Sequence, residues 1–343
     1  MLLDKISFAK SLFFAKWSKP KPVVVHLNLT NFCNLECPHC YGHYWGKKGV
    51  KDIPTEQLAS LIDEVARMGC KRISFCAGEP LMRQDIGELI SHAKSKKLIC
   101  GMNTNGHLVR RRIRDILNLD SITISLDGNR ERHDSMRGRG SYDIVVDAIR
   151  CAKENGIPVH TSTLICKENI RDIEHIIKLA NEIGFMTEWL LPFYNSPYQL
   201  MPSEDDLRKI LELILRYKKD GYPISLSKRA ITHALRWPDY RKRYMKESIP
   251  RGGFRCYANK IHFIMEPDGR FYPCCQQVGI FPAEDFREVG IARAFENIEQ
   301  KNDCLACYSF FSMHDYNLLV NHDLGVWWNY LSNIFKEKKL IKK

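Results

Sequence analysis

The sequence predicts an α/β protein with a curled, mostly parallel sheet, followed by a smaller α+β region rich in cysteine. Strand-like and helical patterns alternate six times between residues 23 and 194, and Gly69, Gly156 and Gly184 stop three of the helical patterns. A hairpin pattern with clustered cysteines follows from residue 252. Strands that alternate with helices indicate a parallel sheet covered by helices. Because such crossovers are right-handed, six units in series favour a curled sheet or partial barrel.

The individual elements follow from hydrophobic periodicity. We expect strands at residues 23–30, 73–78, 99–106, 121–128, 159–166 and 188–194, and helices at 55–69, 85–97, 141–156, 169–184 and 203–219. In the first helix, Leu58, Leu61, Ile62 and Val65 share one face. In such a sheet, functional residues lie on the loops at the carboxyl ends of the strands.

The chain divides into five predicted segments. These are an N-terminal amphipathic segment (1–22), an α/β core (23–200), a helical linker region (201–250), a cysteine-rich domain (251–316) and a C-terminal basic aromatic helix (317–343).

Composition limits the protein class. The chain has 343 residues, a net charge of +12 and 13 cysteines. It opens with no secretory signal, and no apolar run approaches the roughly 20 residues of a membrane span. We therefore expect a reducing, cytoplasmic setting in which the cysteines are thiols or metal ligands. The charge favours an anionic partner, although a lysine-rich solvated surface explains it equally well.

Three cysteines directly follow the first strand. Cys33, Cys37 and Cys40 form a Cys-x3-Cys-x2-Cys pattern in "CNLECPHC". Zinc sites of structural type and ordinary iron–sulfur clusters take four protein ligands. Three thiolates leave one metal position open, which is typical of a reactive site. A zinc knuckle or incidental thiols are the alternatives.

This pattern, with Glu36, Pro38 and His39 between the cysteines, resembles the signature of the radical S-adenosylmethionine (radical SAM) superfamily. The resemblance implies a partial (β/α)6 barrel, and a [4Fe–4S] cluster whose fourth iron binds S-adenosylmethionine. It also implies reductive cleavage to a 5′-deoxyadenosyl radical, which abstracts a hydrogen atom from an unactivated C–H bond. A flavodoxin- or ferredoxin-type electron donor would supply the electron. His39 stands at a position that is usually aromatic.

The ends of the next strands match further motifs of this family. "AGEP" (77–80) resembles the motif that contacts the methionine amino group, with Ala77 where the family usually has glycine. By resemblance, "MNTNG" (102–106), "SLDG" (125–128) and "HDSMRG" (133–138) line the cofactor. The cofactor-binding residues implied are His39, Gly78, Glu79, Pro80, Asn103, Asn105, Ser125, Asp127 and Arg137. Arg137 is the expected partner of a carboxylate, because a guanidinium binds carboxylates in a bidentate way.

A second set of four cysteines lies in the C-terminal region. Cys256 and Cys274 flank a predicted hairpin with a Pro-Asp-Gly turn (267–269), and Cys304 and Cys307 follow as Cys-x2-Cys. This arrangement resembles the twitch domain, a shortened form of the SPASM domain of radical SAM enzymes. The resemblance implies one auxiliary [4Fe–4S] cluster, and a structural zinc site is the alternative. Cys275 is surplus to this set.

The two ends of the chain combine aromatic residues with lysines. Such helices either dock on their own domain or lie on a membrane surface. A peripheral membrane contact would make a lipid an attractive substrate, beside a small anionic metabolite. A modifier of ribosomally made peptides is the alternative enzyme, and a zinc-binding protein that contacts nucleic acid is the alternative from another class. The three-cysteine loop and the neighbouring motifs argue against the last, so no nucleic-acid partner is expected.

Overall fold

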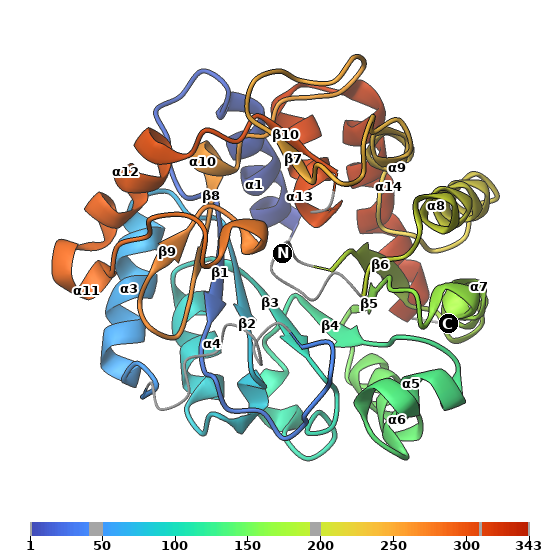
Figure 1. Cartoon of the computed structure of the whole chain (residues 1–343). Helices are drawn as coiled ribbons and strands as arrows, with labels where there is room; N and C mark the ends of the chain where they lie inside the picture. Colours follow the sequence, from blue (N-terminus) through green and yellow to red (C-terminus); the bar gives the residue numbers. More distant parts are fainter. Residues whose placement is uncertain (1, 41–50, 193–199, 309–310, 342–343) are drawn as a thin grey trace.

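The computed structural model of the chain describes residues 2–40, 51–192, 200–308 and 311–341. Its centre is an eight-stranded sheet with the strand order β6-β5-β4-β3-β2-β1-β8-β9 (Figure 1). The strands are β1 (Val24–Asn28), β2 (Arg72–Cys76), β3 (Ile99–Thr104), β4 (Ser121–Ser125), β5 (Val159–Leu164), β6 (Met186–Leu190), β8 (His262–Met265) and β9 (Phe271–Tyr272). The first six are neighbours in chain order and pair in parallel, so the predicted partial (β/α)6 barrel is confirmed.

The strands alternate between an apolar outer face and a polar inner face. In β1, Val25 and Leu27 belong to the main hydrophobic core, whereas His26 and Asn28 line the barrel interior. The inward positions of the other strands include Arg72, Ser74, Asn103, Ser121, Thr123, Ser125, His160, Ser162 and Glu188. Because side chains alternate along a strand, this period of two gives the barrel a hydrophilic lumen.

Helices cover the outer face. They are α3 (Thr55–Arg67), α4 (Ile86–Ser95), α5 (Arg130–Arg137), α6 (Ser141–Glu154) and α7 (Ile173–Ile183). Leu58, Leu61, Ile62 and Val65 of α3 are fully buried, as the periodicity predicts. Each of these four side chains contributes roughly 1.5–3 kcal/mol through burial.

The predicted strands all end two or more residues later than the observed strands, and two predicted starts also differ by two or more residues. The sixth strand begins at Met186, two residues before the predicted start, because Met186 pairs with His160 of β5. The end of the predicted strand 188–194 falls partly on residues 193–199, which lie outside the described residues. The fourth predicted helix begins at Ile173 after a single 3-10 turn (Ile170–Asp172).

The predicted hairpin of the cysteine-rich region extends the barrel sheet. Strands β8 and β9 are antiparallel and joined by a turn in which Gly269 has a φ of 82°. Strand β8 then pairs in parallel with β1, with Val24 opposite His262. The remaining elements of this region are β7 (Tyr244–Met245), α10 (Ala258–Ile261), α11 (Phe286–Val289), α12 (Ile291–Lys301) and β10 (Ala306–Cys307).

The ends of the chain meet beside the barrel. Helices α1 (Leu2–Phe14), α13 (Phe311–Val320) and α14 (Leu324–Ile341) form a second core with Phe8 and Leu12 from α1 and Leu319 from α13. Helices α8 (Glu204–Lys219) and α9 (Lys228–Leu235) pack on each other, and α9 contacts α13 and α14. Among the described residues, no helix combines the length and apolar character needed to cross a bilayer.

Candidate functional site

A cavity of about 290 Å³ lies at the carboxyl ends of the parallel strands. The three cysteines of the first motif line it: Cys37 is buried, Cys40 partly exposed and Cys33 exposed. Other predicted cofactor-binding residues in the lining are His39, Gly78, Asn103, Asn105, Ser125 and Arg137. The topology therefore collects residues from five separate segments at the edge of the sheet where the sequence predicts a site.

The "AGEP" turn explains the glycine at position 78. Both Ala77 and Gly78 have positive φ values, of 62° and 52°. A Cβ atom on Gly78 would lie 2.3 Å from the carbonyl oxygen of Phe32 and 2.6 Å from that of Thr30. The Glu79 amide then donates to Phe32 O at 2.8 Å. Gly78 is thus required where its backbone meets the cysteine loop, and this contact ties the second strand end to the first.

The carboxylate of Glu79 is fully buried beneath the cavity. It accepts hydrogen bonds from the Thr104 hydroxyl (2.7 Å), the Asn105 amide (2.8 Å) and the Leu81 amide (3.1 Å). Pro80 is also buried and begins the 3-10 turn that Glu79 caps. These bonds join the ends of β2 and β3, so Glu79 positions the cavity wall. Its contact with a methionine amino group stays a prediction.

Arg137 enters the cavity from the end of α5, held by a buried carboxylate. Its Nε donates to Asp127 Oδ2 at 2.5 Å, and His39 Nε2 lies 3.7 Å from the same oxygen. Despite complete burial, which raises a carboxyl pKa, the Arg137 charge and the nearby His39 and His133 keep the pKa of Asp127 below its usual value. Asp127 therefore fixes the guanidinium that lines the cavity.

Burial raises the pKa of Cys37 to about 11, and the charge of Arg137 opposes this rise. An uncomplexed Cys37 is therefore a neutral thiol at physiological pH, and a metal must displace its proton. Asn105 lies against the same loop, because its Nδ2 donates to Asn34 Oδ1 at 2.8 Å and approaches Cys33 Sγ at 3.7 Å. No motif in the sequence predicts this contact of Asn34.

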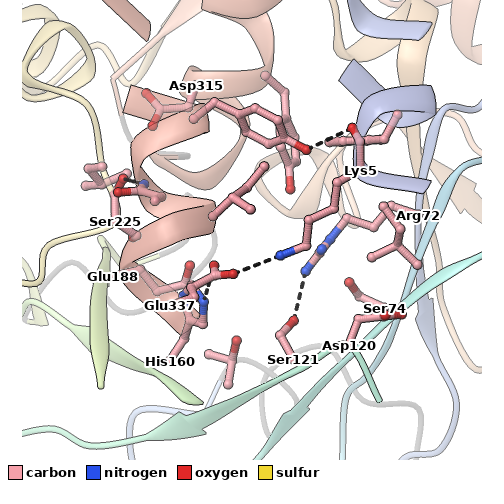
Figure 2. Close-up of a pocket in the computed structure, with 18 of the residues that line it drawn as sticks. Lys5, Arg72, Ser74, Asp120, Ser121, His160, Glu188, Ser225, Asp315 and Glu337 are labelled. Carbon is pink, nitrogen blue, oxygen red and sulfur yellow. Dashed lines mark hydrogen bonds and ion pairs between the residues drawn. The ribbon is translucent and has the colours of Figure 1, made fainter. Parts of the chain in front are cut away.

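The barrel lumen continues below this cavity. A lower chamber of about 190 Å³ shares His26, Asn103 and Glu188 with the upper cavity and is closed by side chains of α1, α13 and α14. Figure 2 shows Lys5 reaching Glu337 and Arg72 reaching Ser121 across this chamber.

Arg72 is a cationic group on the chamber wall, which also carries the carboxyl groups of Asp120, Glu188, Asp315 and Glu337. Its Nη2 donates to Ser121 Oγ at 3.3 Å, whereas Lys5 is paired with Glu337 at 2.9 Å. Burial raises the pKa of Glu188, which favours its neutral form. Sequence reasoning missed these lumen residues, although the alternation of polar residues in the strands carries the signal.

A pair of histidines links the lumen to the cysteine-rich region. His26 Nδ1 lies 2.7 Å from His262 Nε2, and His262 Nδ1 lies 2.8 Å from the carbonyl oxygen of Pro273. Pro273 directly precedes Cys274 in the chain.

The four C-terminal cysteines meet at one small cavity. Cys256, Cys274, Cys304 and Cys307 all line it. Two polar side chains of α13 approach the sulfurs: His314 Nε2 lies 3.6 Å from Cys307 Sγ, and Asn317 Nδ2 lies 3.6 Å from Cys256 Sγ. Cys275 lines the upper cavity of the barrel instead.

Both thiol sets have the number of thiols that the predicted groups require. Three thiols beside an open cavity match a cluster with one free metal position, and four thiols around a closed cavity match a fully ligated group. Within the described ranges, no three His, Cys, Asp or Glu side chains are arranged to hold a single metal ion.

Known proteins share this core. Residues 27–180 match the radical SAM superfamily. An Fe-coproporphyrin III synthase of Methanosarcina barkeri is 37% identical over 171 residues, which cover 49% of this chain and 43% of the relative. An AdoMet-dependent heme synthase of the same organism is 26% identical over 295 residues, 81% of this chain and 83% of the relative. The match thus spans less than half of the first relative and most of the second.

A solved structure extends the likeness to the fold of both regions. Streptococcus suis SuiB bound to S-adenosylmethionine superposes with a TM-score of 0.63 at 15% identity, over 82% of this chain and 68% of that one. The same protein has been solved with its precursor peptide SuiA. With the cysteine loop and the strand-end motifs gathered at one cavity, residues 27–180 form a radical SAM domain.

Proposed function

We propose that this enzyme abstracts a hydrogen atom from an unactivated C–H bond of an anionic substrate held in the barrel lumen. The meeting of Cys33, Cys37 and Cys40 at the mouth of that lumen carries the proposal. When bound there, the cluster and S-adenosylmethionine supply the 5′-deoxyadenosyl radical. The protein's task is to bind, orient and shield the reactants.

Residues of the chain have separate tasks in this proposal. Arg137, held by Asp127, binds the carboxylate of S-adenosylmethionine, because a fixed guanidinium matches that group. Asn103, Asn105 and Ser125 offer polar contacts from the ends of β3 and β4. The lumen receives the substrate, and Arg72 in its lower chamber pairs with an anionic group of that substrate.

The second thiol set holds an auxiliary [4Fe–4S] cluster in this proposal. Cys256, Cys274, Cys304 and Cys307 are its ligands, with His314 and Asn317 beside the sulfurs. Polar groups near cluster sulfurs tune the reduction potential. Zinc at this site would make it structural and leave the first site unchanged.

Candidate substrates can be tested in a defined order. Both relatives are named for the synthesis of porphyrins, which makes porphyrins the first class of compound to test, since porphyrin carboxylates meet the requirement for an anionic group. Anionic lipids follow, and a ribosomally made peptide is the alternative substrate class. A flavodoxin or ferredoxin is the electron donor that we propose.

The test compares the protein with a variant in which Cys33, Cys37 and Cys40 are all alanine. Both are reconstituted anaerobically with iron and sulfide, and their metals and 5′-deoxyadenosine formation are measured. We expect about eight irons in the protein and about four in the variant, which should form no 5′-deoxyadenosine. Cleavage retained in the variant contradicts the first site, and four irons with one zinc in the protein contradict the auxiliary cluster.

A further inference from the structure

The outer faces of α1 and α14 expose apolar side chains in regular stripes. On α14, Leu324, Trp328, Leu331 and Phe335 are all exposed and follow helical spacing. Ile6, Phe13 and Phe14 of α1, and Trp17 just beyond it, are exposed as well. These eight residues are more than half of the fifteen large hydrophobic residues that are exposed in the described part of the chain, yet they lie in two short segments.

These helices do not need their outer apolar residues for docking on the domain. Phe8 and Leu12 of α1 and Val326 and Ile334 of α14 already face inward and are buried. The two helices contact each other through Phe13 and Trp327, whose ring centroids are 5.8 Å apart. Tryptophans 17 and 328 remain 65% and 74% exposed, which is unusual for the largest apolar side chain.

The same segments carry most of the net charge. Residues 1–22 and 324–343 contain ten lysines against Asp4 and Glu337, so they provide eight of the twelve net positive charges. Glu337 is moreover paired with Lys5. Aromatic residues beside lysines are typical of helices that lie at the surface of an anionic bilayer.

A basic groove borders the α14 stripe. It has a volume of about 620 Å³ between α9 and α14, and Trp328 lines it. Its cationic residues are Lys218, Lys228, Arg229, Arg236 and Lys336, and the described residues of its wall include no carboxylate. Lys336 donates to the carbonyl oxygens of Gly221 and Tyr222, and Arg229 lies 3.5 Å from Asp323 beside the groove. The groove thus offers a cluster of cations next to an exposed tryptophan.

From these observations we propose that α1 and α14 form a membrane-docking face for anionic phospholipid. The aromatic stripes enter the boundary between headgroups and acyl chains, and the basic groove receives a phosphate headgroup. Charge complementarity selects this occupant over a second copy of the chain, because two such basic faces would repel each other.

Vesicle co-sedimentation of the full-length, cluster-loaded protein tests the proposal. Vesicles of phosphatidylcholine alone are compared with vesicles that also contain phosphatidylglycerol. One variant combines Trp17→Ser and Trp328→Ser, and a second combines Lys228→Gln and Arg236→Gln. The matched control combines Leu117→Ser and Ile144→Ser, which change exposed apolar residues on other elements. Circular dichroism and iron content check that each variant is folded.

We expect the protein to bind strongly to the anionic vesicles only. Both test variants should bind these vesicles roughly tenfold or more weakly, and the control variant should bind them as the unchanged protein does. Failure of the protein to sediment with anionic vesicles overturns the proposal. So does thermal stabilisation by inorganic phosphate without vesicle binding, which would assign the groove to a soluble phosphate. A dimer that the tryptophan variant dissociates, again without vesicle binding, would assign the stripes to a second copy.

Discussion

The half-buried His26 and the buried His262 form a pair whose proton positions follow from a third contact. His262 Nδ1 lies 2.8 Å from the carbonyl oxygen of Pro273, which can only accept, so Nδ1 carries the proton. Burial lowers the pKa of His262 to about 4, so the ring is neutral and its Nε2 accepts. His26 Nδ1 must then donate across the 2.7 Å contact. Burial also holds the pKa of His26 well below 6.5, so its Nε2 carries a lone pair in the lumen wall.

This tautomer leaves Nε2 as the unprotonated nitrogen of His26, on a side chain that lines the lumen. A two-electron oxidation of the substrate would release one proton after the hydrogen-atom abstraction, and we predict that His26 Nε2 accepts this proton. A positioned general base contributes roughly 100-fold or more. We expect His26→Gln to lower product formation by about that factor while 5′-deoxyadenosine still forms in the presence of substrate. Chromatographic quantification of both products is the measurement.

The ratio of the two products identifies the role. Equal losses of product and of 5′-deoxyadenosine would mean that His26 supports the site only structurally. The control is Ser162→Ala, which changes another inward residue on β5 and leaves the histidine pair in place.

Much of the fold is predictable because its signals are local. The periodicity of α3 and the strand-end motifs place the three cysteines at the correct edge of the sheet. The pairing of β8 with β1 was not predictable, since a parallel contact between residues 24 and 262 leaves no local pattern. The histidine pair depends on that same long-range pairing, because His26 and His262 meet across it.

Hydrophobic periodicity alone did not predict the polar lumen, although polar residues in the strands indicate it. Residues such as Arg72, Ser74 and Glu188 interrupt apolar strands at every second position. A parallel strand in a doubly covered sheet reads as continuously apolar, so this interruption distinguishes a barrel that encloses a polar cavity. The contacts of Asn34 and Asn317 with their sites arise from tertiary packing and have no such signal.

Three buried histidines predict that the protein loses stability in mild acid. Burial lowers the pKa of His133, His233 and His262 to about 4 each. Their usual pKa is about 6.5. Below that pH these histidines are protonated in the unfolded chain but remain neutral in the folded protein. The stability is therefore complete above about pH 6.5 and falls as the pH drops toward 4, by up to about 1.4 kcal/mol per pH unit for each histidine.

Urea denaturation between about pH 7 and pH 5 measures this slope. His133→Gln should reduce it by up to about 1.4 kcal/mol per pH unit, because the glutamine does not titrate. An unchanged slope in this variant would show that His133 binds its proton equally well in both states.

Ala77 and Gly78 are neighbours with opposite expected responses to substitution. Ala77 holds a left-handed conformation that costs an alanine about 1–2 kcal/mol, whereas glycine adopts it freely. Glycine also increases the conformational entropy of the unfolded chain, which offsets part of this gain. Ala77→Gly should therefore stabilise the protein by about 0.5 kcal/mol. Gly78→Ala should destabilise it by about 2 kcal/mol or more, because the new Cβ meets two carbonyl oxygens. Urea denaturation of both variants is the check, and stabilisation by Gly78→Ala would contradict the contact with the cysteine loop.

Cys274 and Cys275 are adjacent in sequence but line different cavities. Cys274 belongs to the four-cysteine cavity, whereas Cys275 lines the upper cavity of the barrel with the three-cysteine loop. We therefore expect Cys274→Ser to lower the iron content from about eight to about four per chain, since a cluster held by four thiolates loses a ligand. Cys275→Ser should keep about eight irons and the visible spectrum unchanged.

The Cys274→Ser and Cys275→Ser variants together distinguish a role in cluster binding from a role in substrate binding. Because Cys275 faces the lumen, its serine variant should change product formation while 5′-deoxyadenosine still forms, and iron analysis beside product quantification reveals this combination. If Cys275→Ser loses iron and Cys274→Ser retains it, the two assignments must be exchanged, and the segment after β9 would present Cys275 to the auxiliary site.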